Sequence, residues 1–447
     1  MSTHVVVIGA GFAGQAALDH LAKGRSDLRM TVIDQNLYST FQPLLYQVAT
    51  GGLNPGDVSY PVGGFAGPRK ARYLQGSLAS IDSEGRKITL ADGRTVDYDY
   101  LILATGVTAA FFGVTGAAEH SFALYTRADA VALRDHFMSG LEKLSFSEPP
   151  DAAGSPRAVR EEITKETVSQ DSSVREFAVT VVGGGPTGVE LAGTAAELRR
   201  AVLRATFPDI DPSRIHIRVV EMAPGLLMPF EEKLRKYTYR QLVKRGVDIR
   251  LNTEVLAVEP GMVKLKGGET LPSDLTVWAS GVAAPDAVGQ WGVPQGQHGR
   301  IQVGADLRVV GQDRIFAAGD IAIFEDNPSP QLAQPALQEG KHAAKQIKRL
   351  IAGQQTQPFH YFDKGMVATI GRSAAVVQLP KGIRLTGFLA WLGWFGLHLM
   401  YLLGFRNRVS TIINLSWRYI AWGHGGSVIV GDNPALASKV AVVNRDT

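Results

Sequence analysis

Residues 5–14 read VVVIGAGFAG, an apolar run that leads directly into a glycine-rich turn. The run predicts a buried β-strand, and the residues after the turn predict a helix and then a second strand that ends near residue 33. Gly9 permits a tight bend, Gly11 lets the backbone approach a pyrophosphate, and Gly14 allows the helix to pack closely on the sheet. The stretch therefore predicts a βαβ unit with a phosphate-binding helix N-terminus.

A carboxylate stands where such a unit needs one. Asp34 ends the second strand, 20 residues after Gly14, and there it can accept hydrogen bonds from ribose hydroxyls. A GxGxxG pattern alone is a weak signal, since a glycine-rich turn can exist without any ligand. The strand, the helix and Asp34 together predict a dinucleotide site.

The same unit recurs about 170 residues later. Residues 178–182 predict a strand, Gly183, Gly185 and Gly188 repeat the three glycine roles, and Glu221 closes the following strand. A carboxylate there suits NADH and disfavours the extra phosphate of NADPH. The gap from Gly188 to Glu221 is 33 residues, longer than the usual ~20, and the loop 207–212 can absorb the excess.

Two copies of a nucleotide-binding unit predict an α/β fold with two doubly wound parallel sheets. Three later strand ends carry small residues of the kind that border a cofactor. They are Ala104-Thr105-Gly106, the stretch 278–281 (WASG) and Gly319-Asp320. At the last, Asp320 can reach a cofactor's polar chain while Gly319 lets the backbone come near.

Composition excludes several chemistries. The 447 residues include no cysteine, so disulfides, thiolate nucleophiles, iron–sulfur clusters and cysteine zinc sites are all excluded. The 10 histidines show no metal-ligand spacing, so we expect no metal site. The net charge of +4 comes without a basic, aromatic-interleaved stripe, which argues against nucleic-acid binding. The first strand begins at once, so we infer no export signal.

Together these motifs resemble the flavoproteins with two dinucleotide-binding domains and, within them, the type II NADH:quinone oxidoreductases. Three further stretches carry the closer resemblance: residues 40–49 (TFQPLLYQVA), residues 182–193 (VGGGPTGVELAG) and residues 333–338 (AQPALQ). In that family the last of these, AQxAxQ, lies beside the flavin ring and the quinone pocket. The resemblance covers nearly the whole chain, apart from the polar stretch 147–176.

The resemblance implies an order of sites and domains. It assigns FAD to the first unit, through Gly9, Gly11, Gly14, Asp34, Thr105, Gly106, Gly319, Asp320, Ala333 and Gln334, and NADH to the second, through Gly183, Gly185, Gly188 and Glu221. The FAD domain would comprise residues 1–120 and 290–350, and the NADH domain residues 121–289 with a polar insertion at 147–176. Residues 351–447 would form a C-terminal domain.

The resemblance also implies catalytic residues. Gln334 and Gln338 would lie near the quinone, with Lys381 as a further candidate that otherwise simply flanks a membrane helix. Glu190 matches a family glutamate between the nicotinamide and quinone regions. Buried, it could relay a proton; alternatively, it merely stabilises the helix N-terminus. Family members often carry an acidic residue four positions later, where this chain has Thr194, with Glu197 one turn beyond.

The stretch 385–405 carries no Lys, Arg, Asp or Glu and is 21 residues long, the bare length of a spanning helix. Four glycines, His398 and basic residues at both ends favour a helix that lies in the membrane interface. The stretch 409–422 adds an amphipathic helix, with Thr411, Asn414 and Arg418 on one face. A spanning helix, a soluble core helix and a dimer interface are the alternatives.

Without cysteine, electrons must leave the flavin directly for a diffusible acceptor. The sequence therefore predicts FAD-dependent oxidation of NADH and two-electron reduction of a membrane quinone, without proton pumping. The enzyme would bind the cytoplasmic side of the membrane through residues 385–422, and it could form a homodimer. A soluble reductase of a protein acceptor such as ferredoxin is the main rival, and a flavoprotein with an interaction role and slow turnover is another.

Overall fold

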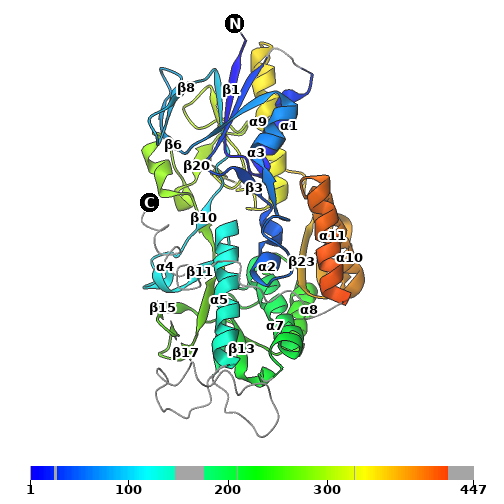
Figure 1. Ribbon diagram of the computed structural model, residues 1–447. Helices are drawn as coiled ribbons and strands as arrows, with labels where there is room; N and C mark the ends of the chain where they lie inside the picture. Colours follow the sequence, from blue (N-terminus) through cyan, green and yellow to red (C-terminus); the bar gives the residue numbers. More distant parts are fainter. Residues whose placement is uncertain (1, 25–27, 146–175, 209, 327, 421–447) are drawn as a thin grey trace, which may run out of the picture.

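The computed structural model describes residues 2–24, 28–145, 176–208, 210–326 and 328–420. Two parallel five-stranded sheets dominate it, one near the N-terminus at the top of Figure 1 and one at the bottom. The predicted α/β fold with two Rossmann-like sheets is confirmed. The predicted insertion 147–176 lies, except for Glu176, outside the described residues.

The first sheet has the strand order β21-β9-β1-β2-β5, with all neighbours parallel. Its strands are β1 (His4–Ile8), β2 (Arg29–Asp34), β5 (Ala71–Gln75), β9 (Tyr100–Leu103) and β21 (Ile315–Ala317). The three strands β1, β9 and β21 are apolar and fully buried, as is typical of central parallel strands, whereas β5 at the sheet edge is mostly only partly buried or exposed. Helices α1 (Phe12–Ala22) and α9 (Ala333–Ile351) lie side by side on one face (Figure 1).

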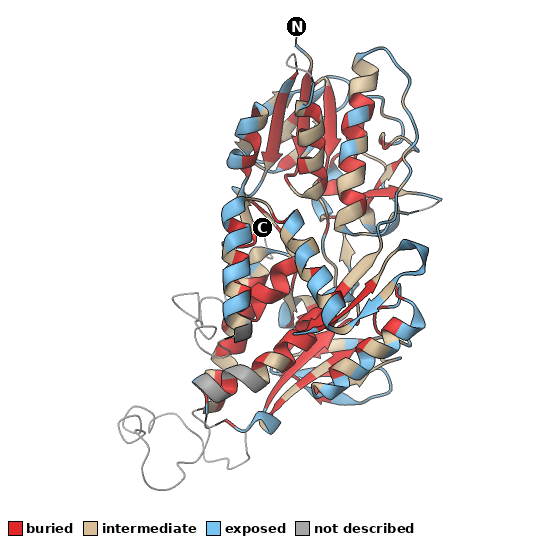
Figure 2. Ribbon diagram, turned by 90° about the vertical axis from the view of Figure 1, so that its right-hand side faces the viewer, coloured by how far each residue is buried: buried red, intermediate tan, exposed pale blue. Residues whose placement is uncertain are grey.

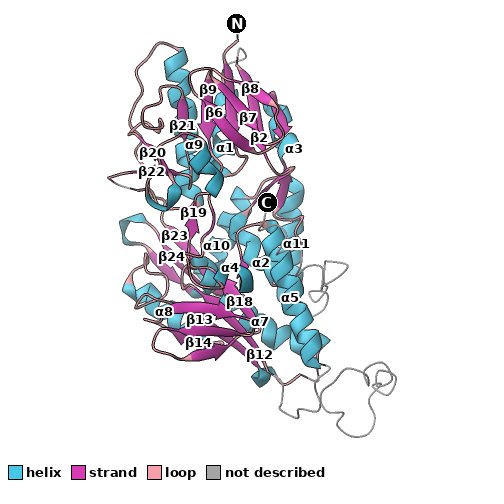
Figure 3. Cartoon of the chain, turned by 90° about the vertical axis from the view of Figure 1, so that its left-hand side faces the viewer, coloured by secondary structure: helices cyan, strands magenta, loops and turns pink. Residues whose placement is uncertain are grey.

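The second sheet has the order β11-β18-β12-β13-β14 and is also parallel. Its strands are β11 (Phe122–Ala123), β12 (Phe177–Val182), β13 (Ile215–Val220), β14 (Val247–Arg250) and β18 (Leu275–Trp278), and its helices are α5 (Arg127–Ser145), α7 (Pro186–Thr206) and α8 (Glu232–Lys244). Figure 3 shows the two sheets in different halves of the molecule, one above the other. Because α7 is 21 residues long and α1 only 11, most of the longer gap before Glu221 is helix.

Short elements connect and border the sheets. Antiparallel strands join the two halves through β10 (Thr108–Ala109) and β19 (Val282–Ala283). The remaining short elements are β3 (Tyr38–Thr40), η1 (Gln42–Leu44), α2 (Leu45–Ala49), β4 (Ser59–Pro61), α3 (Val62–Ala66), η2 (Gly67–Arg69), β6 (Leu78–Asp82), β7 (Lys87–Leu90), β8 (Thr95–Asp97), α4 (Ala117–His120), η4 (Pro212–Arg214), β15 (Val255–Glu259), β16 (Met262–Leu265), β17 (Thr270–Pro272), η5 (Asp286–Gln290), η6 (Gln297–Gly299), β20 (Ile301–Val303) and β22 (Ala322–Phe324).

The C-terminal part begins with an antiparallel sheet of β23 (Met366–Gly371), β24 (Ala374–Gln378) and β25 (Arg384–Thr386), with η7 (Pro380–Gly382) before β25. Two helices follow, α10 (Gly387–Tyr401) and α11 (Phe405–Ile420). The apolar run 385–405 is therefore not one continuous helix, because non-helical residues 402–404 separate α10 from α11. No described helix combines the length and the apolar character that a membrane crossing requires.

Candidate functional site

The first glycine turn lies where the strand order of its sheet reverses, between β1 and β9, which is the usual ligand site of such sheets. Gly9 has φ +98°, and a Cβ on it would lie 2.2 Å from the carbonyl oxygen of Ala104. A Cβ on Gly14 would lie 1.9 Å from the carbonyl oxygen of Gly9, whereas one on Gly11 would meet nothing within 4 Å. Gly9 and Gly14 thus serve the fold, and Gly11 leaves open space at the N-terminus of α1.

Asp34 fixes the shape of this turn. Its carboxylate accepts hydrogen bonds from the backbone N–H of Ala10 at 2.7 Å and of Asn36 at 2.8 Å. Burial raises the pKa of Asp34, and these two bonds oppose that effect. The carboxylate is therefore oriented beside the turn, with acceptor capacity left over for ribose hydroxyls.

The second glycine turn repeats this construction at its own strand-order reversal, between β12 and β18. A Cβ on Gly183 would lie 2.5 Å from the carbonyl oxygen of Ala279, and one on Gly188 would lie 2.0 Å from that of Gly183. Again a Cβ on the middle glycine, Gly185, would meet no described residue within 4 Å. Glu221 takes the place of Asp34, accepting from the N–H of Gly184 at 2.5 Å and of Ala223 at 2.6 Å.

Gly319 and Asp320 lie in the turn after β21, and groups that the sequence motifs did not indicate hold them there. The backbone N–H of Gly319 donates to the buried Glu339 carboxylate at 2.7 Å, and Arg300 donates to the carbonyl of Asp320 at 2.8 Å. Burial raises the pKa of Asp320 to about 6 and that of Glu339 to about 7. Glu339 directly follows Gln338, so the acidic residue after the AQPALQ motif was the sequence signal that could have indicated this contact.

Helix α9 brings the AQPALQ motif against α1. A Cβ on Gly340 would lie 2.0 Å from the carbonyl oxygen of Ala13, so the two helices touch at their backbones. Ala333 begins α9, and the side-chain oxygen of Gln334 beside it is buried and has no hydrogen-bond partner among the described residues. The hydroxyl of Thr105, two residues after β9, is likewise buried, and no described residue pairs with it. Such atoms are expected to find partners in a bound ligand.

Gln338 is occupied differently from Gln334. Its side-chain nitrogen donates to the carbonyl of Phe362, and its oxygen accepts from the N–H of Phe362, both at 3.0 Å. Both polar atoms therefore brace the loop before β23. Lys381 is exposed on η7, between β24 and β25.

Glu190 is buried in the first turns of α7. One carboxylate oxygen accepts a hydrogen bond from the backbone N–H of Thr369 on β23 at 3.2 Å. Burial raises its pKa to about 8, while Thr369 and Trp394 favour the ionised form, although the Trp394 indole N–H does not complete a hydrogen bond. Thr194 turns back and donates to the Glu190 carbonyl at 2.7 Å, so it contacts the helix itself.

An aromatic cluster connects the first glycine turn with α10. Ring centroids are 5.7 Å apart for Phe12 and Phe41, 6.1 Å for Phe41 and His398, and 4.5 Å for His398 and Trp394. Burial lowers the pKa of His398 to about 4, so the ring is neutral at pH 7. A pocket beside this cluster is lined by Gly11, Phe12 and Phe41 on one side and by Tyr401 to Leu403 and Asn407 on the other.

Helix α11 confirms the predicted amphipathic pattern and shows which face is inward. The polar face docks on α2 and on the loop after it. Asp57 in the loop accepts from Ser410 at 2.6 Å and from Asn414 at 2.7 Å, and Arg418 donates to Gln47 of α2 at 2.9 Å. The apolar face points outward (Figure 2). With the outward side of α10 it forms an apolar surface that consists of Phe388, Leu389, Leu392, Met400, Phe405, Val409, Ile412, Ile413 and Trp417.

Comparison with known proteins gives consistent results. Residues 3–340 match the family described as pyridine nucleotide-disulphide oxidoreductase. The type II NADH:quinone oxidoreductase NdhA of Mycobacterium tuberculosis is 36% identical, covering 94% of this chain and 86% of its own. The type II NADH:quinone oxidoreductase of Staphylococcus aureus is 30% identical, covering 82% of this chain and 87% of its own.

A solved structure shows the same fold. It is that of NDH2 from Plasmodium falciparum in complex with NADH, with a TM-score of 0.82 at 21% identity. The match covers 96% of this chain and 100% of that one. It therefore extends through both parallel sheets and the C-terminal part.

Proposed function

Because this chain belongs to the pyridine nucleotide-disulphide oxidoreductase family and, within it, to the type II NADH:quinone oxidoreductases, we propose that it passes two electrons from NADH through bound FAD to a quinone at a membrane surface. The observation that carries the proposal is the pair of glycine turns built alike, each with its own carboxylate. Two such sites suit one dinucleotide that stays bound as a cofactor and a second that binds and dissociates as a substrate. With no cysteine in the chain, no thiol intervenes between flavin and acceptor.

The residues of the first site fit FAD. Open space above Gly11 at the N-terminus of α1 suits a pyrophosphate, and Asp34 offers acceptors to a ribose. The Thr105 hydroxyl, in the loop after β9, and the Gln334 oxygen, at the start of α9, are buried and find no partner in the described part of the chain, so both are available to a ligand. FAD supplies a carrier that accepts a hydride and releases two electrons. The chain's own task is to orient the partners and to exclude water.

The second site would hold NADH. Gly185 leaves the corresponding space at the N-terminus of α7, and Glu221 replaces Asp34. A carboxylate at this position would repel a 2′-phosphate, so the proposal includes a preference for NADH over NADPH.

Replacing Glu221 with glutamine is expected to narrow that preference. The amide oxygen still accepts from Gly184, while the negative charge that opposes NADPH is removed. We expect the ratio of kcat/KM for NADH to that for NADPH to fall by about tenfold, since one such charge contact corresponds to about 1.4 kcal/mol. Steady-state kinetics with both nucleotides measures the ratio. An unchanged ratio would mean that Glu221 does not face the 2′ position.

The proposed quinone region adjoins the pocket beside the aromatic cluster. This pocket extends from Gly11 to the break between α10 and α11, and the apolar surface lies on the outward sides of those two helices. A bilayer-soluble quinone could enter there. Arg406 is exposed at the same break and suits anionic head groups. We propose peripheral binding on the cytoplasmic side, without proton pumping. A ferredoxin-type docking role would leave the exposed apolar surface without a use.

Glu190 is proposed to supply a proton to the reduced quinone. With a pKa of about 8 it holds its proton at pH 7 and loses it above pH 8, so the rate of quinone reduction should fall as the pH rises through about 8. Replacing it with glutamine should remove this dependence and slow the quinone step by roughly 100-fold. Anaerobic stopped-flow measurement of flavin reoxidation by a short-chain quinone tests both. Flavin bleaching by NADH is the control and should stay fast; a variant that keeps the wild-type pH profile would exclude Glu190 as the donor.

A further inference from the structure

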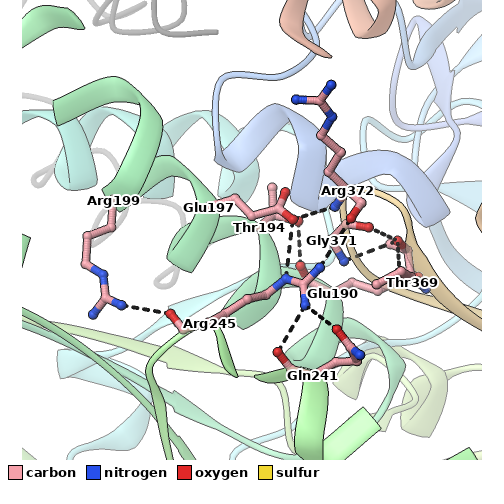
Figure 4. A network of polar contacts seen from close by, with 10 residues as sticks. Glu190, Thr194, Glu197, Arg199, Gln241, Arg245, Thr369, Gly371 and Arg372 are labelled. Atoms are coloured by element: carbon pink, nitrogen blue, oxygen red, sulfur yellow. Dashed lines mark hydrogen bonds and ion pairs between the residues drawn. The ribbon is translucent and has the colours of Figure 1, made fainter. Parts of the chain in front are cut away.

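Two carboxylates of α7 reach the same β-hairpin (Figure 4). Glu190 accepts from the N–H of Thr369 at 3.2 Å, and Glu197 accepts from the N–H of Arg372 at 2.5 Å. They are seven residues apart, so they lie on one face of the helix two turns from each other. Between them a Cβ on Gly193 would lie 2.2 Å from the carbonyl oxygen of Ile370. Helix and strand therefore touch at their backbones between two fixed points.

Glu197 is itself firmly held. Arg245, which directly follows α8, lies 3.4 Å from its carboxylate, and both side chains are only 13% exposed. Arg245 also donates to the carbonyl of Arg372 at 3.2 Å and to the side chain of Gln241 at 2.9 Å. Burial raises the pKa of Glu197, while Arg245, the N–H of Arg372 and the charge of Arg418 lower it. The carboxylate thus joins α7, α8 and the hairpin turn.

Hydrogen bonds within the β23–β24 turn connect Thr369 with the part of the turn that Glu197 holds. The Thr369 hydroxyl lies 3.2 Å from the carbonyl oxygens of Gly371 and Ala374 and accepts from the N–H of Gly371 at 3.3 Å. Gly371 has φ +129°, and a Cβ on it would lie 2.2 Å from the Glu197 carboxylate. The Thr369 N–H that donates to Glu190 therefore lies at the end of β23, and the turn that follows is held by Glu197.

We infer that Glu197 is a positioning residue for Glu190: it holds the β23–β24 turn so that the Thr369 N–H reaches the Glu190 carboxylate. The inference rests on the proposed proton role of Glu190. The groups that bear on Glu190 are the Thr369 N–H and Trp394, and those that bear on Glu197 are Arg245, the Arg372 N–H and Arg418. Because the Thr369 bond favours the ionised form of Glu190, loosening the turn raises the Glu190 pKa.

The test uses the full-length flavin-loaded protein with Glu197→Ala, Glu197→Gln and Gly371→Ala. Gly371→Ala disturbs the turn without changing any charge, which covers the case that Glu197→Ala fails to fold. Glu232→Ala is the matched control, because Glu232 forms an exposed pair with Lys236 at 2.6 Å on the surface of α8. One readout is hydrogen exchange of the peptide 366–378; the other is the pH profile of quinone reduction.

Exchange at Thr369 should become at least about tenfold faster in Glu197→Ala and Gly371→Ala. The midpoint of the pH profile should move up by about half a unit, the equivalent of one modest hydrogen bond. Glu197→Gln retains an acceptor, so its exchange rate and its midpoint should stay close to those of the wild type. Glu232→Ala should change neither quantity. Unchanged exchange, or faster exchange with an unmoved midpoint, would overturn the inference. A flat pH profile in Glu190→Gln confirms that the profile reports the titration of Glu190. An unaltered pH profile in that variant refutes the proton role of Glu190. In that case the exchange data alone decide whether Glu197 holds the turn.

Discussion

Valine at position 11 is expected to give a folded chain without flavin. A Cβ there would meet none of the described residues within 4 Å, so the sheet and α1 should form normally. It would instead fill the space that a pyrophosphate needs above the helix N-terminus. Such a clash costs about 3 kcal/mol or more, which corresponds to a loss of roughly a hundredfold in affinity.

The same replacement at Gly185 should have the opposite outcome. Gly185 is equally open, but it belongs to the second turn. Gly185→Val should therefore purify yellow with a full complement of flavin, while NADH bleaches it roughly a hundredfold less efficiently. Flavin absorbance per chain, circular dichroism and anaerobic stopped-flow bleaching measure the pair.

The pair decides which turn serves which nucleotide. If Gly11→Val kept its flavin and lost its response to NADH, the order of the two sites would be reversed. Gly14→Val is the contrasting variant, because its Cβ would lie 1.9 Å from a backbone oxygen. It should reduce the yield of folded protein itself, whichever nucleotide is bound.

Aspartates on the apolar surface should release the protein from membranes. Ile413 is 59% exposed and Trp417 is 62% exposed on the outward face of α11. A charge placed in the membrane costs about 2.5 kcal/mol or more at the bilayer centre and less near the interface. Ile413→Asp with Trp417→Asp should therefore weaken binding to anionic vesicles by at least roughly tenfold. Cosedimentation with vesicles measures the affinity.

The matched control places aspartates on exposed apolar residues elsewhere. Leu256 on β15 is 49% exposed and Val310 is 50% exposed, and neither belongs to α10 or α11. Leu256→Asp with Val310→Asp should leave vesicle binding intact. Both double variants should reduce a water-soluble short-chain quinone normally, because Ile413 and Trp417 point away from the docked face. If the α11 variant kept its vesicle affinity but changed from dimer to monomer, the apolar surface would be a dimer interface instead.

The sequence alone was sufficient for the two nucleotide-binding units. Each unit depends on a short strand, three glycines and one carboxylate within about 40 residues. These features can be recognised from local periodicity and turn chemistry. The α/β class, the paired turns and the amphipathic pattern of α11 were predictable for this reason. The confirmed pattern of α11 shows the limit as well, since a helix with two faces does not reveal which one points inward.

Only the tertiary structure decided how the remaining groups behave. Asp57 meets Ser410 across 353 positions of the chain, and this contact directs the apolar face of α11 outward. The pKa of Glu190 depends on its burial against β23 and on Thr369, 179 positions away. Glu339 of α9 reaches Gly319 in the turn after β21. Burial and long-range partners are set by the packing of all elements together. Local sequence patterns do not contain that information, because desolvation depends on every neighbour in space.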